Sequence, residues 1–142
     1  MPQQKVDCTE LKEGYEFPQA SFCLDSSQVN AYIKTVNETS ALYRNTKLVP
    51  PMAIVALAMA ALSESVSFPS GAIHVSQEVE FLDTVSINDV IISHSRVSRK
   101  QKRGPVNLMA IEIHAFNENN KEVLAGKTEF ILPDPAVASD KQ

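Results

Sequence analysis

The sequence lacks an excess of positive charge. Its 142 residues include 13 lysines and arginines against 17 aspartates and glutamates, a formal net charge of −4. The global basic field that would attract a phosphate backbone is therefore missing, and nucleic acid is not the expected partner. Any site for an anion must be a local cluster of cations.

Cysteines and long apolar runs are also scarce. Cys8 and Cys23 are the only two cysteines, which is too few for a disulfide-rich secreted scaffold and gives no metal-ligand spacing. Residues 1–7 contain no apolar signal-peptide core, and the uncharged run 48–63 is shorter than the ~20 residues that span a bilayer. We therefore expect a soluble, cytoplasmic protein with reduced thiols, no bound metal and no membrane partner.

Length and periodicity predict one folded domain. A chain of 142 residues is long enough to bury the core of a single domain. Residues 1–14 and 134–142 lack an apolar pattern, so we expect them to be flexible tails on either side of a folded unit, residues 15–133.

Two helices are expected in the first half of the chain. Asp25–Ser27 is a candidate N-cap cluster for a helix whose apolar side chains recur at i, i+3, i+4 and i+7. A second helix, residues 50–65, opens with two prolines, which a first helical turn tolerates, and continues with apolar residues on every side. Such a helix is expected to be buried on all sides.

Most of the remaining chain favours β-strands. A short strand is expected at residues 16–24, and longer strands at 73–82, 90–99, 106–116 and 123–132. The polar segments between the last three strands are typical of hairpin turns, so these strands form an antiparallel meander.

Alternation predicts which side chains face the core. In the strand 73–82, Ile73 is expected on the core face together with Val79 and Phe81, with His74 on the opposite face. The whole pattern predicts an α+β fold in which an antiparallel sheet wraps around a central apolar helix. One curled sheet leaves edges and a helix flank uncovered, so we expect pairing with a second such unit.

Four segments, in this order along the chain, carry a family resemblance. They are Glu38-Thr39-Ser40-Ala41-Leu42-Tyr43, Val49-Pro50-Pro51-Met52 at the start of the central helix, Phe81–Val90 and Lys102-Arg103-Gly104. Residues 15–133 resemble the MaoC-like branch of the hot-dog fold, which includes (R)-specific enoyl-CoA hydratases and β-hydroxyacyl thioester dehydratases. The resemblance implies a hot-dog protein that binds acyl-CoA or acyl-carrier thioesters, with CoA or phosphopantetheine as part of the substrate and no separate cofactor.

The first segment departs from the hydratase motif of that family, Asp-x-Asn-Pro-Leu-His, whose Asp and His act as a water-handling acid/base pair. Glu38 stands at the Asp position and Tyr43 at the His position, and only Leu42 matches. A Tyr phenol, with an ordinary pKa of ~10, is a poorer base than a His at ~6.5. The pattern therefore resembles the non-catalytic hot-dog subunits of the family, which shape the acyl tunnel while a partner supplies the acid/base residues.

Glu38 and Tyr43 remain the candidate catalytic residues. If both face an apolar pocket, Glu38 could donate a proton while Tyr43 orients a water or the thioester carbonyl. The competing interpretation is an exposed loop carboxylate and a half-buried phenol.

Several functions stay open on this evidence. They are an accessory acyl-thioester-binding subunit, a weak enoyl-thioester hydratase or dehydratase, which is a lyase, an acyl-CoA thioesterase using Glu38, and a non-enzymatic acyl-CoA-binding module. The partner subunit could be a second copy or another hot-dog chain, and the sequence does not decide between them.

The start of the central helix is the candidate substrate-binding segment, Pro51, Met52 and Ala53. The first N–H groups of a helix lack intrahelical partners and lie at the positive end of its dipole. Because the prolines have no N–H, the amides of Met52 and Ala53 would be the first donors to a thioester carbonyl, as in an oxyanion hole. Capping of these amides by water is the alternative.

One cationic cluster is the candidate binding site for the phosphates of CoA or phosphopantetheine. It comprises Arg99, Lys100, Lys102 and Arg103, at a hairpin expected near the mouth of the tunnel. The alternative is a solvated turn that keeps the surface soluble.

Overall fold

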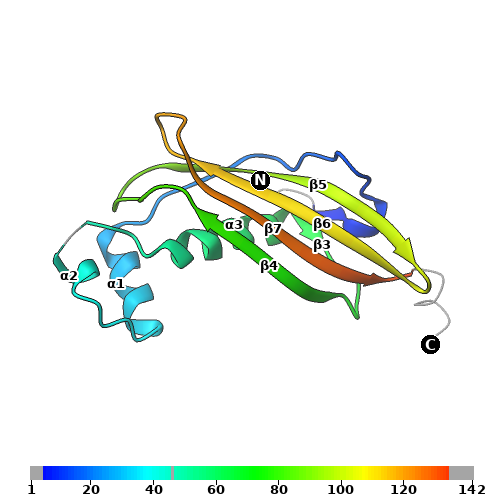
Figure 1. The fold of residues 1–142 in the computed structure, drawn as a ribbon, viewed down its shortest axis with the longest axis horizontal. Coiled ribbons are helices and arrows are strands. Elements are labelled where there is room, and N and C mark those ends of the chain that lie inside the picture. The colour runs from blue at the N-terminus through cyan, green and yellow to red at the C-terminus, as the bar shows by residue number, and fades with distance from the viewer. Residues whose placement is uncertain (1–4, 46, 135–142) are drawn as a thin grey trace.

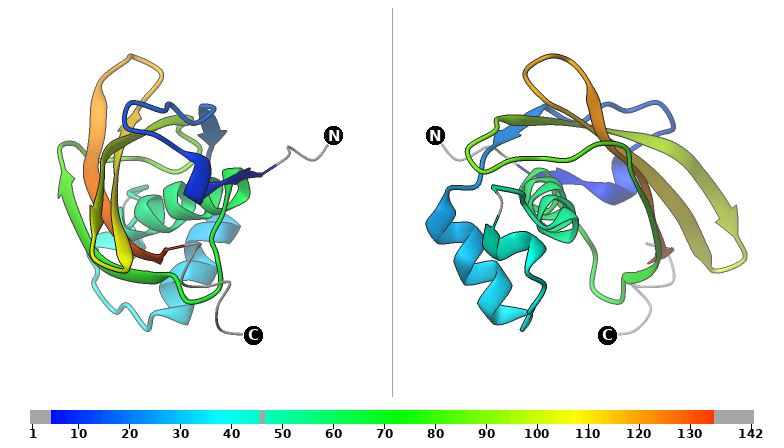
Figure 2. Two further views of the ribbon diagram at one scale, coloured as in Figure 1. Left: turned by 90° about the vertical axis from the view of Figure 1, so that its right-hand side faces the viewer. Right: turned by 60° about the vertical axis from the view of Figure 1, so that its left-hand side comes forward.

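A five-stranded antiparallel sheet curls around one long helix in the computed structural model, which describes residues 5–45 and 47–134 (Figures 1 and 2). The elements in chain order are β1 (Val6–Asp7), a 3₁₀ turn (Cys8–Glu10), β2 (Ala20–Phe22), α1 (Ser26–Thr35), α2 (Leu42–Asn45), α3 (Pro51–Ser65), β3 (Val66–Ser67), β4 (Ile73–Phe81), β5 (Ile91–Arg103), β6 (Val106–Phe116) and β7 (Glu122–Pro133). The sheet runs in the order β2-β5-β6-β7-β4, and the short strands β1 and β3 pair separately in parallel. The predicted α+β architecture and the β5-β6-β7 meander are confirmed.

The predicted start of α1 is confirmed by its cap. The Asp25 carboxylate accepts a hydrogen bond from the Gln28 amide at 2.8 Å, and the Gln28 side chain accepts one from the Asp25 amide at 3.0 Å. This reciprocal capping box satisfies two amides that the helix would otherwise leave unpaired. Beyond the helix, Asn37 takes a positive φ of 56° and turns the chain toward α2.

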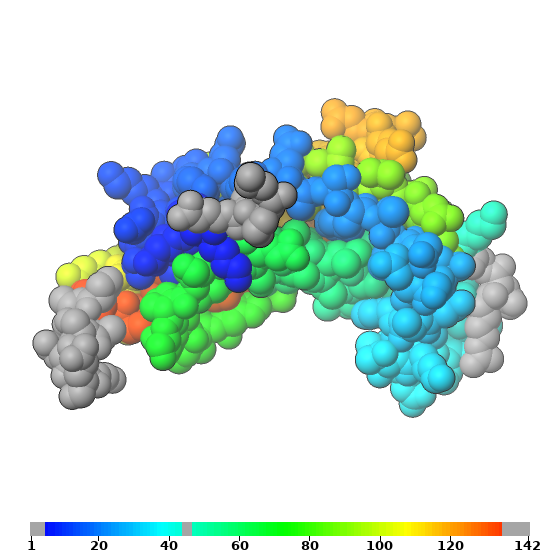
Figure 3. All heavy atoms as spheres, turned by 180° about the vertical axis from the view of Figure 1, so that it is seen from behind, coloured from blue at the N-terminus to red at the C-terminus, as the bar shows by residue number. Residues whose placement is uncertain are grey.

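The sheet covers only part of the surface of α3. The buried side chains of the helix are Ala53, Ile54, Val55, Ala58 and Leu62. Met52 is 50% exposed, and Ala56 and Ala60 also face solvent. From behind, part of α3 is visible between the N-terminal segment and α1 (Figure 3). The expectation of burial on all sides is wrong for the single chain, because one curled sheet closes around one side of the helix.

Residues 5–14 are packed against the core rather than forming the flexible tail we expected. Val6–Asp7 pair with β3, and the side chains of Cys8 and Leu11 are buried. Lys100 holds this segment to β5, because its Nζ donates to the carbonyl oxygens of Thr9 at 2.8 Å and Leu11 at 2.7 Å. Because the backbone of this segment is irregular, its sequence has no apolar periodicity from which the packing could be predicted. Residues 1–4 and 135–142, the rest of the expected tails, lie outside the described residues.

A bulge in β4 changes which side chains face the core. The register with β7 shifts between His74 and Ser76. As a result, the His74 ring stacks on buried Phe130 with ring centroids 4.8 Å apart, and its Nε2 lies within hydrogen-bond distance of Thr128 Oγ1. Ile73 is 56% exposed. The predicted faces are therefore wrong at this end of the strand, because one extra residue moves the side chains beyond it to the other face.

Candidate functional site

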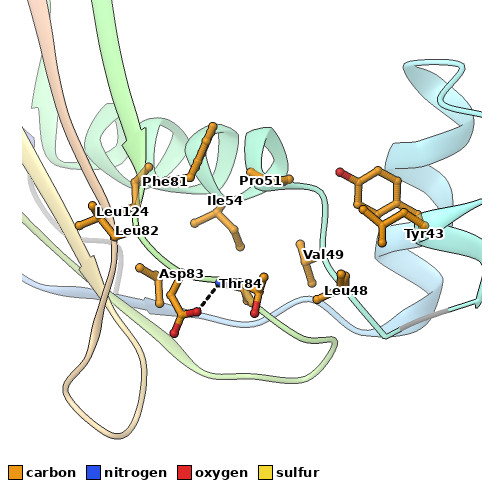
Figure 4. A pocket seen from close by; sticks show the side chains of 13 residues that line it. Tyr43, Leu48, Val49, Pro51, Ile54, Phe81, Leu82, Asp83, Thr84 and Leu124 are labelled. Carbon is orange, nitrogen blue, oxygen red and sulfur yellow. Dashed lines mark hydrogen bonds between the residues drawn. The ribbon is translucent and has the colours of Figure 1, made fainter. Parts of the chain in front are cut away.

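A mostly apolar pocket of about 320 Å³ opens at the start of α3 (Figure 4). Its walls come from α2 and the segment after it, the first turns of α3, the end of β4 with the loop that follows, and the start of β7. The lining residues are Leu42, Tyr43, Leu48, Val49, Pro51, Ile54, Phe81, Leu82, Asp83, Thr84, Val85, Val123 and Leu124.

Backbone hydrogen bonds fix two walls of the pocket against each other. The segment before α3 runs beside the loop after β4, where the Val49 amide donates to the Val85 carbonyl at 2.8 Å and the Ile87 amide to the Lys47 carbonyl at 2.7 Å. Val49 and Val85 are both buried. The pocket is thus framed by paired backbone rather than by side chains alone.

Tyr43 lies in the pocket. The short helix α2 that carries it begins at a Ser40 turn, where the Ser40 hydroxyl accepts from the Leu42 amide at 3.2 Å. The hydroxyl end of Tyr43 points toward Pro51 across the pocket (Figure 4). No other described residue makes a side-chain hydrogen bond to this phenol, which leaves it available to a bound molecule.

Glu38 lies on an exposed turn and does not line the pocket. Its carboxylate accepts a hydrogen bond from the Ser40 amide at 2.9 Å, and its own amide donates to the Ile33 carbonyl at the end of α1. Glu38 therefore shapes the turn between the two helices. Its proton-transfer role with Tyr43 stays a prediction, and Glu38 would have to turn from solvent to fulfil it.

The start of α3 has fewer free amide donors than the sequence predicted. The Ala53 amide already donates to the Pro50 carbonyl at 3.0 Å, and the Ala53 side chain is buried. An oxyanion hole from the amides of both Met52 and Ala53 is therefore not formed, because the first turn of the helix uses one of them internally. The Met52 amide has no hydrogen-bond partner among the described residues, and Pro51 lines the pocket.

Asp83 is a pocket residue that sequence reasoning missed. Its Oδ1 accepts from the Thr84 amide at 2.8 Å, and its Oδ2 lies 3.0 Å from Lys121 Nζ. The hydrogen bond from Lys121, followed by that from the Thr84 amide, holds the pKa of Asp83 below its ordinary value. Asp83 belongs to the segment 81–90 that carries the family resemblance, but nothing in its spacing indicates its pairing with Lys121, 38 positions along the chain.

The cationic cluster lies at the other end of the sheet from the pocket (Figure 1). Leu124 of the pocket is in register with Ala115 of β6, and Ala115 with Ser93 of β5. Arg103 follows Ser93 by about ten residues, which is about 30 Å at the rise of a β-strand. Within one chain, the expectation of a cluster near the tunnel mouth is therefore wrong, because β5 continues through these residues and carries them away from the pocket.

All four of these cations make polar contacts within the chain. Lys100 binds the carbonyls of the N-terminal segment, and Lys102 Nζ lies 3.3 Å from Asp134 Oδ2. Arg99 and Arg103 both hydrogen-bond the Gln101 side chain. Phosphate binding by this cluster stays a prediction, with Arg99 and Arg103 better placed for it than Lys100.

The described ranges contain neither a metal-binding cluster nor a membrane-spanning helix. No group of three or more His, Cys, Asp or Glu side chains in residues 5–45 and 47–134 is placed to hold a metal ion. In the same part of the chain, no helix is both long and apolar enough to cross a membrane.

Comparison with known proteins identifies the fold. No protein-family model and no curated protein matches the sequence. Among solved structures, the (R)-hydratase from A. caviae involved in PHA biosynthesis is 16% identical with a TM-score of 0.73, over 89% of this chain and 100% of that chain. A MaoC-like dehydratase from Rhodospirillum rubrum is 12% identical with a TM-score of 0.74, over 91% and 97%. The HadBC (3R-hydroxyacyl-ACP dehydratase) complex from Mycobacterium tuberculosis is 14% identical with a TM-score of 0.68, over 84% and 96%.

At these identities the likeness shows the fold. It confirms that the chain has the hot-dog fold of MaoC-like proteins, which its sequence segments implied.

Proposed function

We propose that this protein binds acyl thioesters of CoA or an acyl carrier, with the acyl chain in the apolar pocket at the start of α3. The observation that carries the proposal is the pocket itself, whose walls are mainly aliphatic and whose polar groups are confined to Tyr43, Asp83 and Thr84. A volume of about 320 Å³ lies at the lower end of the range of about 300–1,000 Å³ typical of small-molecule sites. A short acyl chain suits this space better than a bulky ring system.

The apolar walls set the expected contribution of the acyl chain. Burial of each CH₂ group contributes about 0.8 kcal/mol, which is about a fourfold gain in affinity. The Tyr43 hydroxyl, in the pocket, and the free Met52 amide, in the first turn of α3, are donors that could bind a thioester carbonyl. These two groups can donate hydrogen bonds, but neither is an acid/base pair for proton transfer.

An accessory role fits this geometry better than independent catalysis. Tyr43 replaces the histidine of the hydratase motif, and Glu38 faces solvent rather than the pocket. We therefore assign the chain to acyl binding beside a hot-dog subunit that carries the acid/base residues. HadBC, a solved neighbour of this fold, is itself a complex of dehydratase subunits.

Turnover assays separate the accessory role from the alternatives. The purified protein alone should leave crotonyl-CoA absorbance unchanged and release no free thiol from acyl-CoA. Hydration of crotonyl-CoA by the protein alone, lost in Glu38→Gln and Tyr43→Phe, would instead make it a hydratase. Thiol release lost in Glu38→Gln would make it a thioesterase.

A further inference from the structure

We propose that Leu124 closes the deep end of the pocket and limits the length of the acyl chain that the protein binds. The inference rests on the proposed function and deepens it, because it names short acyl groups as the substrate class and one side chain as the limit. A longer acyl group would have to displace Leu124 and enter the space between α3 and the sheet.

Leu124 lies at the opposite end of the pocket from Tyr43 (Figure 4). It belongs to β7, where Phe81 of β4 and Ala115 of β6 are in register with it on either side. Its side chain is 2% exposed. A thioester whose carbonyl binds to the Tyr43 hydroxyl therefore extends its acyl chain toward Leu124.

A second, much smaller cavity lies behind Leu124. Its walls include Val55 and Ala58 of α3, Val79 of β4 and Gly126 of β7, and its volume is about 10 Å³. Such a space is at the lower limit for holding one water molecule. Among the described residues, Leu124 alone lines both this cavity and the pocket. Its side chain is therefore the partition between them.

The small cavity continues the pocket along three elements at once. The lining residues shift by four positions along α3 and by two along β4 and β7, from Ile54 to Ala58, from Phe81 to Val79 and from Leu124 to Gly126. Four residues of a helix rise by ~6 Å and two residues of a strand by ~6.6 Å. Because the three shifts agree, the cavity is the next space between helix and sheet, toward the C-terminal end of α3.

The surroundings of the small cavity are mainly aliphatic. Glu78 and Lys127 also line it, but they alternate with Val79 and Gly126 along their strands, so their side chains point to the outer face of the sheet. Gln77 is a polar lining residue on the helix face, and it is exposed. A shorter side chain at position 124 would therefore open the pocket into a space that CH₂ groups can enter without burying a charge.

Leu124→Ala tests the partition, because it truncates the side chain to a methyl group. Calorimetric titration with butanoyl-, hexanoyl-, octanoyl- and decanoyl-CoA gives the acyl length at which affinity stops rising. For the wild type we expect this limit at hexanoyl- or octanoyl-CoA. In Leu124→Ala the limit should be longer by about two carbons. The first acyl-CoA beyond the wild-type limit should then bind about tenfold more tightly to the variant, since two more CH₂ groups are buried.

Three further variants keep the test decisive. Leu132→Ala makes the same truncation at another buried position of β7 that lines neither cavity, and it should leave the limit unchanged. Leu124→Ala/Ala58→Val refills the opened space from α3 and should restore the wild-type limit. Leu124→Val serves if Leu124→Ala does not fold. It should strengthen binding of the first acyl-CoA beyond the limit by about fourfold, the value of one CH₂ group.

The outcomes separate this inference from the proposed function. A limit that stays unchanged in Leu124→Ala, or that moves equally in Leu132→Ala, would overturn the role of Leu124 while the pocket still binds acyl thioesters. A wild-type affinity that still rises at decanoyl-CoA would also overturn it. A wild type that binds none of these acyl-CoAs would overturn the proposed function, and this inference with it.

Discussion

The ammonium nitrogen of Lys121 lies 3.0 Å from Oδ2 of Asp83 and joins the β6–β7 turn to the loop after β4. On its other oxygen, Asp83 accepts a hydrogen bond from the Thr84 amide. Asp83 and Thr84 both line the pocket, so this contact holds one of its walls in place. The ion pair is partly exposed, and its main effect is to position the loop.

The first prediction concerns the acid stability of this contact. Because the pKa of Asp83 is lowered by Lys121, the folded protein binds the proton less readily than the unfolded chain. Asp83 therefore stabilises the fold above its ordinary pKa of ~3.9, and this contribution is lost as the pH falls through the lowered value. Asp83→Asn should lower the free energy of unfolding at neutral pH and weaken its fall toward acid pH, as measured by urea unfolding. Glu118→Gln is the control, and an unaltered acid dependence in Asp83→Asn would refute the assignment.

The second prediction separates two roles for Lys100. Lys100→Met leaves the carbonyls of Thr9 and Leu11 without their charged donor, so the free energy of unfolding should fall by about 1.5–3 kcal/mol. Lys102→Met removes an ion pair with Asp134 whose lysine is 70% exposed, and should cost less than about 1 kcal/mol. Denaturant unfolding measures both variants. If Lys100→Met kept full stability but weakened CoA binding, Lys100 would be a phosphate ligand instead.

The third prediction tests the phenol in the pocket. Tyr43→Phe should weaken binding of hexanoyl-CoA by about 3- to 10-fold, the value of one hydrogen bond, with little change in stability. Tyr15→Phe, at a phenol that does not line the pocket, should bind as the wild type does. Calorimetric titration gives the comparison. Equal affinities for the two variants would mean that Tyr43 does not contact the ligand.

The fourth prediction distinguishes the two thiols. Burial raises the pKa of Cys8 to about 11, whereas Cys23 is exposed. In the native protein a thiol reagent should therefore modify Cys23 rapidly and Cys8 only on unfolding. The folded thiol also ionises less readily than the unfolded one, so stability should decline as the pH rises from the ordinary value of ~8.5 toward this raised pKa. Rapid labelling of native Cys23→Ser would contradict the buried position of Cys8.

Regular alternation made much of the fold predictable. Met109, Ile111, Ile113 and Ala115 occupy every second position of β6, and all four are buried, as alternation predicts for a strand with one core face. The bulge after His74 was not predictable, because it depends on the pairing of β4 with β7 rather than on either strand alone. Residues 5–14 were missed for a related reason, since Lys100 on a distant strand holds them in place.

The candidate site was predictable in outline but not in detail. Tyr43 was a candidate on condition that it faced an apolar pocket, and Pro51 belonged to the candidate substrate-binding segment; both line the pocket. Glu38 was a candidate catalytic residue because it stands at the Asp position of the hydratase motif. In the structure, its carboxylate instead accepts a hydrogen bond from the Ser40 amide in the turn before α2. Asp83 escaped notice because its role depends on Lys121, which the fold brings close. Local sequence patterns thus predicted where the pocket lies, whereas long-range contacts determine which side chains line it.

The most direct test of the central claim is a calorimetric titration of the purified protein with hexanoyl-CoA, acetyl-CoA and free CoA. If the pocket holds the acyl chain, affinity should rise with chain length, and hexanoyl-CoA should bind at least about tenfold more tightly than acetyl-CoA because additional CH₂ groups are buried. Equal affinity for the three ligands, or no binding of hexanoyl-CoA, would contradict the assignment of this pocket to an acyl thioester.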